Sequence, residues 1–182
     1  MTRTLVLASG GLDSTAATEL LKRGSPLELL FIDFGQLSRI REWEAAQRIA
    51  EQYAVPIERL DLGRPFGGRE DLPGRNGWLV MTALLAKWPF VGTIVLGIHA
   101  GSRYPDCSPS FMSGMQSALD LYTRGTVRVL APFLAWTKGD IVAFAEASGV
   151  PVHLTYSCEL GRDQPCGLCP SCGDVEARLA RA

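Results

Sequence analysis

The sequence predicts an α/β fold: a parallel, doubly wound sheet with helices on both faces. Short apolar segments bounded by turn residues alternate along the chain with amphipathic helical patterns. Such alternation is typical of parallel strands that are joined by helices. The chain has 182 residues, of which 47% are hydrophobic, so a single domain can bury a substantial core without disulfide bonds.

The first two strands and the first helix are predicted around a glycine turn. Residues 5–8 form a short apolar run, the turn follows at 9–11, and a helical pattern extends from Asp13 to about Arg23. A second apolar run at 27–34 is short and bounded by turn residues, which indicates a buried strand.

The middle of the chain continues this alternation. Apolar residues at three- and four-residue intervals predict an amphipathic helix that contains Ile40, Trp43, Ala46, Ala50 and Tyr53. Residues 55–60 predict the next strand. Residues 63–77 are rich in Gly, Pro and Arg and have no period, so we expect an irregular loop of the length that often carries function.

The rest of the periodic pattern predicts two strands and three helices. Apolar spacing indicates helices around 78–88 and 111–122, and short apolar runs indicate strands at 93–97 and 127–130. The last helix begins at a capping box formed by Thr137 and Asp140 and ends at Gly149. We therefore expect one domain over residues 1–150, with residues 151–182 as a small appendage of it.

Composition excludes several classes of protein. The 18 basic and 19 acidic residues give a net charge of −1, without the basic excess typical of nucleic-acid-binding domains, so we expect no stable nucleic-acid binding. The N-terminal apolar run is too short for a signal peptide, and no segment approaches the roughly 18 apolar residues of a membrane span. We expect a cytoplasmic protein whose thiols stay reduced and which does not bind membranes.

The turn at residues 9–14, Ser-Gly-Gly-Leu-Asp-Ser, predicts an anion-binding loop. Doubly wound sheets bind ligands at such strand-to-helix junctions, and two glycines let a ligand approach the backbone. The turn has neither the Walker pattern nor the Gly-x-Gly-x-x-Gly pattern. Because Asp13 would repel phosphate, we expect Mg²⁺ together with a pyrophosphate. The alternative is a structural turn in which Asp13 or Ser14 caps the helix.

Four of the five cysteines predict a metal site near the C-terminus. Two-residue gaps bring neighbouring thiolates onto one tetrahedron, which suits a structural Zn²⁺. An iron–sulfur cluster and redox disulfides are the alternatives. We expect His153 to be an ordinary surface residue and Cys107 to be a packing residue. The expected ligands are Cys158, Cys166, Cys169 and Cys172.

Residues 9–14 match, at every position, the signature of the PP-loop ATP pyrophosphatases, and the chain as a whole resembles the 7-cyano-7-deazaguanine synthase (QueC) family. The similarity extends from about Thr4 to Cys172. It rests on residues 9–14, 33–36, 73–76, Gly97, 104–107, 137–138 and the four C-terminal cysteines. The resemblance implies an adenine nucleotide alpha-hydrolase (HUP-like) fold, with ATP, Mg²⁺ and Zn²⁺ as the bound groups.

The resemblance also implies a reaction. The chain would adenylate the carboxylate of 7-carboxy-7-deazaguanine and convert it with ammonia, through the amide, to the nitrile 7-cyano-7-deazaguanine (preQ0), a queuosine precursor. AMP and pyrophosphate would be released by this ligase. Family resemblance further suggests a homodimer.

The expected site residues follow from these motifs. ATP is expected at Leu7, Ala8, Ser9, Gly10, Gly11, Leu12, Asp13, Ser14, Thr15, Asp33 and Gly97. Catalysis is expected from Ser9, Asp13, Ser14, Arg75 and Lys138. The positive charge of Lys138 or Arg75 would neutralise the negative charge that develops on the phosphates or on the carboxyl oxygen. The substrate is expected at Gln36, Arg75, Asn76, Tyr104 and Asp106. Lys138 and Arg75 could instead be solvated charges, and Asp33 could be a turn former.

Three stretches depart from the family pattern. Leu37-Ser38 stands where Arg-His is usual, and the loops before Arg75 and Tyr104 are shorter than in the family. Because these loops shape the substrate and amine pockets, an alternative product is the amide, or a conjugate with another amine such as a protein amino group. His99 could serve there as a base, although a lone histidine is more often structural.

Two further classes compete with this hypothesis. One is a non-catalytic module that binds ATP or uses zinc for interaction, and it conflicts with the complete loop at residues 9–14. The other is a tRNA-modifying PP-loop enzyme, which the neutral charge of the chain disfavours.

Overall fold

The computed structural model describes residues 2–24, 26–64, 72–99 and 104–173. Five strands form one sheet in the order β3-β2-β1-β4-β5, and each neighbouring pair is parallel. The strands are β1 (Arg3–Leu7), β2 (Leu27–Asp33), β3 (Ile57–Asp61), β4 (Val91–Val95) and β5 (Arg128–Leu130). The chain moves outward from β1 to β3 and then crosses to β4, so a crevice forms at the carboxyl ends of β1 and β4. The predicted parallel, doubly wound sheet is confirmed.

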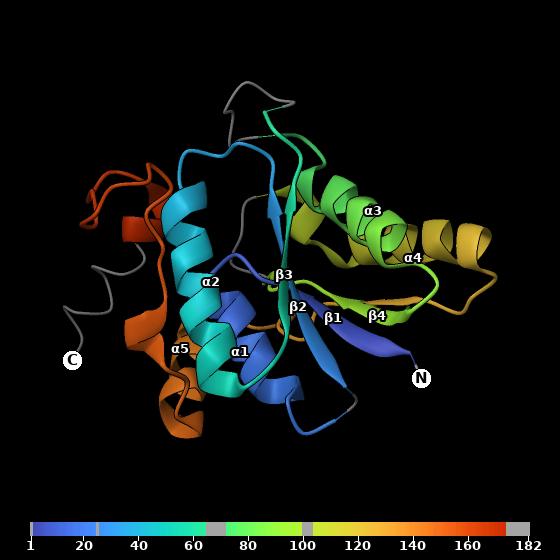
Figure 1. The fold of residues 1–182 in the computed structure, drawn as a ribbon, viewed down its shortest axis with the longest axis horizontal. Helices are drawn as coiled ribbons and strands as arrows, with labels where there is room; N and C mark the ends of the chain where they lie inside the picture. Colours follow the sequence, from blue (N-terminus) through green and yellow to red (C-terminus); the bar gives the residue numbers. More distant parts are fainter. Residues whose placement is uncertain (1, 25, 65–71, 100–103, 174–182) are drawn as a thin grey trace.

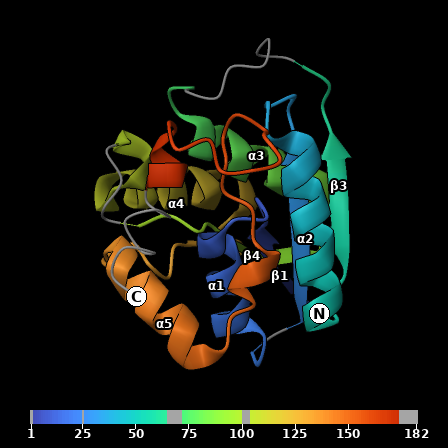
Figure 2. The same ribbon diagram turned by 90° about the vertical axis from the view of Figure 1, so that its left-hand side faces the viewer.

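Helices cover both faces of the sheet, as Figures 1 and 2 show. One face carries α1, α2 and α5, and the other carries α3 and α4. Their bounds are α1 (Leu12–Leu21), α2 (Arg39–Tyr53), α3 (Arg75–Lys87), α4 (Pro109–Thr123) and α5 (Lys138–Ser148), with short 3₁₀ turns at Pro105–Cys107 and Val152–Leu154. In the described part of the chain, no helix is long and apolar enough to cross a membrane.

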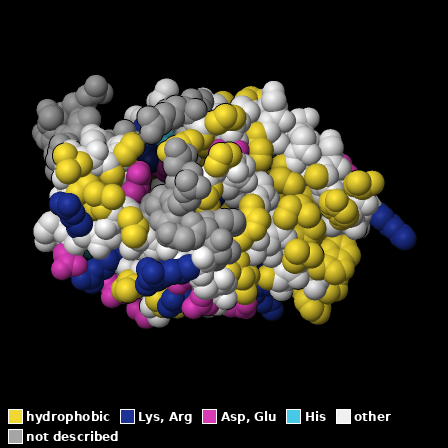
Figure 3. All heavy atoms as spheres, turned by 90° about the horizontal axis from the view of Figure 1, so that it is seen from above, with side chains coloured by type: hydrophobic (Ala, Val, Ile, Leu, Met, Phe, Trp, Pro, Cys, Tyr) yellow, Lys and Arg dark blue, Asp and Glu magenta, His cyan; other side chains and the backbone are white. Residues whose placement is uncertain are grey.

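The side chains of the strands pack into two separate hydrophobic cores, because successive residues of a strand point to opposite faces of the sheet. Leu5 and Ile94 pack in the core beneath α3 and α4, whereas their neighbours Val6 and Val95 pack beneath α1 and α5. Exposed hydrophobic side chains gather at the α3–α4 end of the molecule, which Figure 3 shows from above. The strand alternation thus fixes both layers of helices on the sheet.

The main differences from the sequence prediction concern the starts of two helices and the exposure of one expected core residue. α3 begins at Arg75, inside the expected loop 63–77, and residues 65–71 of that loop lie outside the described residues. α4 begins at Pro109 because the Ser108 side chain accepts a hydrogen bond from the Phe111 N–H and caps the helix. On α2, the expected apolar residue Ile40 is 56% exposed. The buried face of α2 is instead formed by Ala45, Ala46, Ile49 and Ala50.

Glu28 lies on β2, a strand whose seven residues are all buried. Its carboxylate accepts hydrogen bonds from Lys87 and from Arg3 Nη1, the latter at 3.0 Å. Burial by itself raises the pKa of Glu28, but these two hydrogen bonds outweigh it and hold the pKa below its ordinary value. The folded chain is therefore stabilised above the unfolded pKa of glutamate, and this contribution is lost as the pH falls through the lower folded pKa.

Replacing Lys87 with Met should lower the free energy of unfolding by about 2 kcal/mol at pH 7, because it leaves Glu28 buried with only one cationic partner. The loss should shrink as the pH falls below about 4, because Glu28 is then protonated first in the unfolded chain and, at a lower pH, in the folded chain too. Urea denaturation at both pH values measures this. The control is Lys22→Met, which removes a pair with Glu19 in which the lysine side chain is 32% exposed, compared with 15% for Lys87. A loss that is equal at both pH values would contradict the assignment.

Candidate active site and metal centre

A cavity of about 890 Å³ lies at the carboxyl ends of β1, β2 and β4. Small-molecule sites usually measure about 300–1,000 Å³, so this one has room for a nucleotide-sized ligand. One wall is formed by the loop at residues 9–14 and Lys138. A second is formed by Arg75, Asn76 and Tyr104, and a third by residues 155–159 with parts of the cysteine-rich segment.

The loop at residues 9–14 is held in shape by close backbone packing. Gly10 has a φ of +72°, and a Cβ atom there would lie closer than 3.0 Å to the carbonyl oxygen of Glu42 on α2. Across the cavity, a Cβ atom on Gly97 would lie 2.7 Å from the backbone nitrogen of Ser14. Both positions therefore require glycine, since any side chain would push neighbouring backbone away.

The helix start after this loop carries no side-chain cap. The N-cap of α1 is Gly11, which lacks a side chain, and the Ser14 hydroxyl donates to the Gly11 carbonyl oxygen at 3.2 Å. Asp13 and Ser14 thus do not cap α1, contrary to the structural alternative. The side chains of Ser9, Asp13 and Ser14 line the cavity, where helix N–H groups favour an anion. Gly10 and Thr15 lie behind the loop.

Asp13 brings together two residues from distant parts of the chain. One carboxylate oxygen accepts a hydrogen bond from the Lys138 ammonium, and the other lies 3.8 Å from His99 Nε2. Lys138 is the first residue of α5 and is only 25% exposed, so it is not a plain surface lysine. All three side chains line the cavity. Charge of both signs therefore surrounds the place where the loop would bind phosphate.

Four of the five expected substrate residues, all except Gln36, meet at the start of α3. The Arg75 guanidinium lies 6.0 Å from the ring centre of Tyr104. The Asn76 backbone N–H donates to Asp106 Oδ2 at 2.9 Å, and its amide donates to the Asp106 carbonyl oxygen at 3.1 Å. Arg75, Asn76, Tyr104 and Cys107 line the cavity. The Asp106 carboxylate is instead occupied at the N-terminus of α3, where an acidic group complements the helix dipole.

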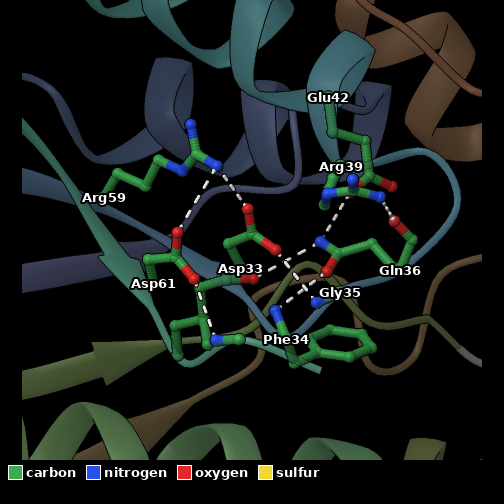
Figure 4. A network of polar contacts seen from close by, with 10 residues as sticks. Asp33, Phe34, Gly35, Gln36, Arg39, Glu42, Arg59 and Asp61 are labelled. Atoms are coloured by element: carbon green, nitrogen blue, oxygen red, sulfur yellow. Dashed lines mark hydrogen bonds and ion pairs between the residues drawn. The ribbon is translucent and has the colours of Figure 1, made fainter. Parts of the chain in front are cut away.

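Figure 4 shows a polar network where β2 joins α2. Asp33 is 2% exposed, and its carboxylate accepts from the Gly35 N–H at 2.9 Å and pairs with Arg59. Gln36 accepts from the Phe34 N–H and donates to Glu42, each at 3.0 Å. Gln36 and Glu42 line the cavity, and Asp33 is not among the lining residues. Asp33 therefore shapes the turn, and its predicted nucleotide contact stays a prediction.

The four C-terminal cysteines form a compact cluster. Their sulfur atoms all lie within 4.8 Å of one another, and three of the residues are buried. Cys166 Sγ and Cys172 Sγ are 3.8 Å apart. Sulfurs bound at about 2.3 Å to a tetrahedral zinc are also about 3.8 Å apart. A four-iron cluster needs more room between its ligands, so the spacing favours one zinc ion. His153 is exposed and lies outside the cluster.

Backbone N–H groups favour the thiolate form of one of these cysteines. Hydrogen bonds from the Leu168 and Cys169 N–H groups lower the pKa of Cys166 to about 6. Burial raises the pKa of Cys172 to about 12. All five cysteines are free thiols. A cation at the centre would supply the charge that the Cys172 thiolate needs, as expected for a zinc ligand.

Glu42 and Tyr156 are two of the cavity-lining residues that sequence reasoning missed. Glu42 lies one helical turn before Ala45 and Ala46, on the buried side of α2, and no motif in the sequence distinguishes it from the other acidic residues of this helix. Tyr156 stands two positions before the first cysteine, and this proximity was the signal available. Residues 100–103, which belong to the altered loop before Tyr104, lie outside the described residues.

Comparisons with known proteins agree with this arrangement. The family model described as "Queuosine biosynthesis protein QueC" matches residues 3–66 and 69–180. A 7-cyano-7-deazaguanine synthase of Synechococcus sp. (strain CC9605) is 32% identical over 210 residues, which cover 98% of this chain and 92% of that protein. One of Desulfitobacterium hafniense (strain DSM 10664 / DCB-2) is 34% identical over 202 residues, covering 94% and 86%.

Solved structures share the fold at low sequence identity. The U34-tRNA thiolase NcsA from Methanococcus maripaludis with its [4Fe-4S] cluster has a TM-score of 0.62 at 14% identity, covering 99% of this chain and 67% of that one. NMN synthetase from Francisella tularensis has a TM-score of 0.57 at 16% identity, covering 90% and 70%. At these identities the likeness concerns the fold alone.

Proposed function

The chain belongs to the QueC family of queuosine biosynthesis proteins, and we propose that it is an ATP-dependent ligase that makes 7-cyano-7-deazaguanine. In this reaction the carboxylate of 7-carboxy-7-deazaguanine attacks the α-phosphorus of ATP and releases pyrophosphate. Ammonia displaces AMP from the acyl adenylate to give the amide. A second ATP then activates the amide oxygen, and loss of AMP leaves the nitrile.

One observation carries the proposal: a single cavity joins the loop at residues 9–14 to the polar corner at Arg75, Asn76 and Tyr104. A triphosphate at the loop would face Lys138, whose charge offsets the charge that develops on the departing pyrophosphate. The corner supplies an amide, a cation and an aromatic ring, which can orient the acid of a fused heterocycle. Proximity of the two reactants accounts for a large part of the rate.

Magnesium bound with the triphosphate would neutralise phosphate charge, and Asp13 is the residue that would hold it. In the protein alone, Lys138 keeps this carboxylate in place. The cysteine cluster would hold zinc through four thiolates, with no open position for substrate. Zinc would therefore serve the structure of the site.

Incubating the pure chain with 7-carboxy-7-deazaguanine, ATP, Mg²⁺ and ammonium should release pyrophosphate and yield the nitrile. Mass spectrometry distinguishes nitrile, amide and unreacted acid, and a reaction without the acid is the control for simple ATP hydrolysis. Absence of both pyrophosphate and a mass change would contradict the proposal.

A second candidate keeps the adenylation and changes the amine. The alignments span 202 and 210 columns, although the chain has 182 residues, so the relatives carry residues that this chain lacks. In addition, Leu37 and Ser38 form the turn between Gln36 and the start of α2, next to the cavity residue Gln36. The same assay decides between the candidates: formation of amide alone, or transfer of the deazaguanine mass to an added amine, would favour the second.

A further inference from the structure

Tyr156 connects the loop at residues 9–14 to the cysteine cluster through its backbone. Its N–H donates to the Gly10 carbonyl oxygen at 2.9 Å. Its own carbonyl oxygen lies 3.6 Å from the position that a Cβ atom on Gly11 would occupy. Tyr156 therefore lies against both glycines of the loop, and it precedes Cys158, the first expected zinc ligand, by two residues.

The side chain of Tyr156 belongs to the cysteine-bearing segment at residues 156–172, called the cysteine loop below. Its ring packs against the buried cysteines, and its hydroxyl donates to the Arg162 carbonyl oxygen at 2.8 Å. One residue thus has its backbone on the nucleotide side and its side chain on the metal side. A displacement of the cysteine loop would pull on the Gly10 hydrogen bond.

The cysteine loop also contacts α2, which supports Gly10 from the opposite side. Gly161 has a φ of +68°, and a Cβ atom there would lie closer than 3.0 Å to the Leu37 carbonyl oxygen. Asp163 pairs with Arg41 on α2. Since α2 packs directly on Gly10 through the Glu42 carbonyl, Gly10 lies between Tyr156 of the cysteine loop and a helix that the cysteine loop also contacts.

We propose that Tyr156 is a positioning residue, through which zinc in the cysteine loop holds the loop at residues 9–14 in its nucleotide-binding shape. The cysteine loop consists mainly of turns, so its order depends on a cross-link between its cysteines. When zinc is bound, Gly10 and Gly11 are already ordered before the nucleotide arrives. Less of the binding free energy is then needed to order the loop, so the nucleotide binds more tightly. The inference rests on the proposed ATP site.

Such coupling is reciprocal, which gives a test that needs no catalysis. Removing zinc from the full chain should weaken binding of Mg²⁺ and α,β-methylene-ATP by about tenfold, a typical size for coupling between two sites. Calorimetry measures this dissociation constant. The same analogue should tighten zinc binding by the same factor when zinc affinity is measured in competition with a chelator.

Two substitutions test the route of coupling while zinc is bound. Tyr156→Phe removes the hydroxyl, which donates to the Arg162 carbonyl oxygen and also interacts with Cys158, and Tyr122→Phe on the exposed face of α4 is its control. Gly161→Ala adds a side chain against Leu37. Gly149→Ala imposes the same backbone strain, with a φ of +69°, where nothing lies within 4 Å. We expect weaker binding of the analogue in Tyr156→Phe and Gly161→Ala, and unchanged binding in both controls.

The outcomes separate this inference from the proposed function. Equal binding of the analogue with and without zinc, in protein whose far-ultraviolet circular dichroism is unchanged, would overturn the coupling alone. If zinc removal unfolds the chain, the zinc-loaded variants decide, and unchanged binding in both Tyr156→Phe and Gly161→Ala overturns it. A zinc-loaded chain that binds no analogue would contradict the proposed function as well.

Discussion

Replacing Lys138 with Gln should lower kcat/KM for ATP about 100- to 1000-fold, the usual cost of losing one preorganised charge at a reacting centre. The substitution removes the ammonium that holds Asp13 and leaves this carboxylate without its strongest partner. The fold should persist, since Lys138 is the first residue of α5 and the capping box of Thr137 and Asp140 remains. Pyrophosphate release in the presence of the acid measures the effect.

The matched control for Lys138 is Lys22→Gln on α1. Lys22 forms an ion pair too, with Glu19, but it is not among the residues that line the cavity. Its replacement should leave the rate within a factor of about two, because Lys22 does not line the cavity and contacts no reactant there. A Lys138→Gln variant as fast as this control would show that Lys138 only positions the start of α5.

Gly10→Ala should lower the free energy of unfolding by about 3 kcal/mol and abolish measurable nucleotide binding. The left-handed backbone conformation costs about 1–2 kcal/mol for alanine, and forcing a methyl group against the Glu42 carbonyl costs about 1–3 kcal/mol more. The loop can relieve the clash only by moving away from α2. Urea denaturation and calorimetry with the ATP analogue measure the two effects.

Gly149→Ala is again the control, because it has the positive φ without the clash. We expect it to lose about 1 kcal/mol of stability and to bind nucleotide normally. Equal losses in the two variants would mean that backbone strain alone explains Gly10 and that its contact with α2 has little weight.

The sheet and its helices could be predicted from the sequence because hydrophobic periodicity is a local property. The capping box at Thr137 and the stop at Gly149 gave the last helix correctly. The predicted boundaries were wrong where the composition of a loop continues into the first turn of a helix, as at Arg75, the first residue of α3. The predicted start of α4 was two residues late, because the apolar spacing begins only at Phe111. Ser108 and Pro109 are a typical N-cap and first helical residue, and they mark the true start.

The site was predictable where a backbone motif defines it and less so where side chains choose partners in space. Residues 9–14 lie at the end of β1, and the four cysteines form one cluster. Pairing is different: Asp33 turns to Arg59 on a neighbouring strand, and Asp106 turns to the backbone of Asn76. No sequence pattern contains these choices, since they depend on which elements become neighbours.

The hydrogen bond between Tyr156 and Gly10 has a consequence for the synthesis of the protein. Gly10 leaves the ribosome early, whereas Tyr156 follows only after all five strands and all five helices have been made. Contacts between such distant residues form late and slow the folding of a chain. A nascent chain therefore lacks one contact of the loop at residues 9–14 until translation is nearly finished, so full affinity for the proposed nucleotide is expected only once Tyr156 has been made.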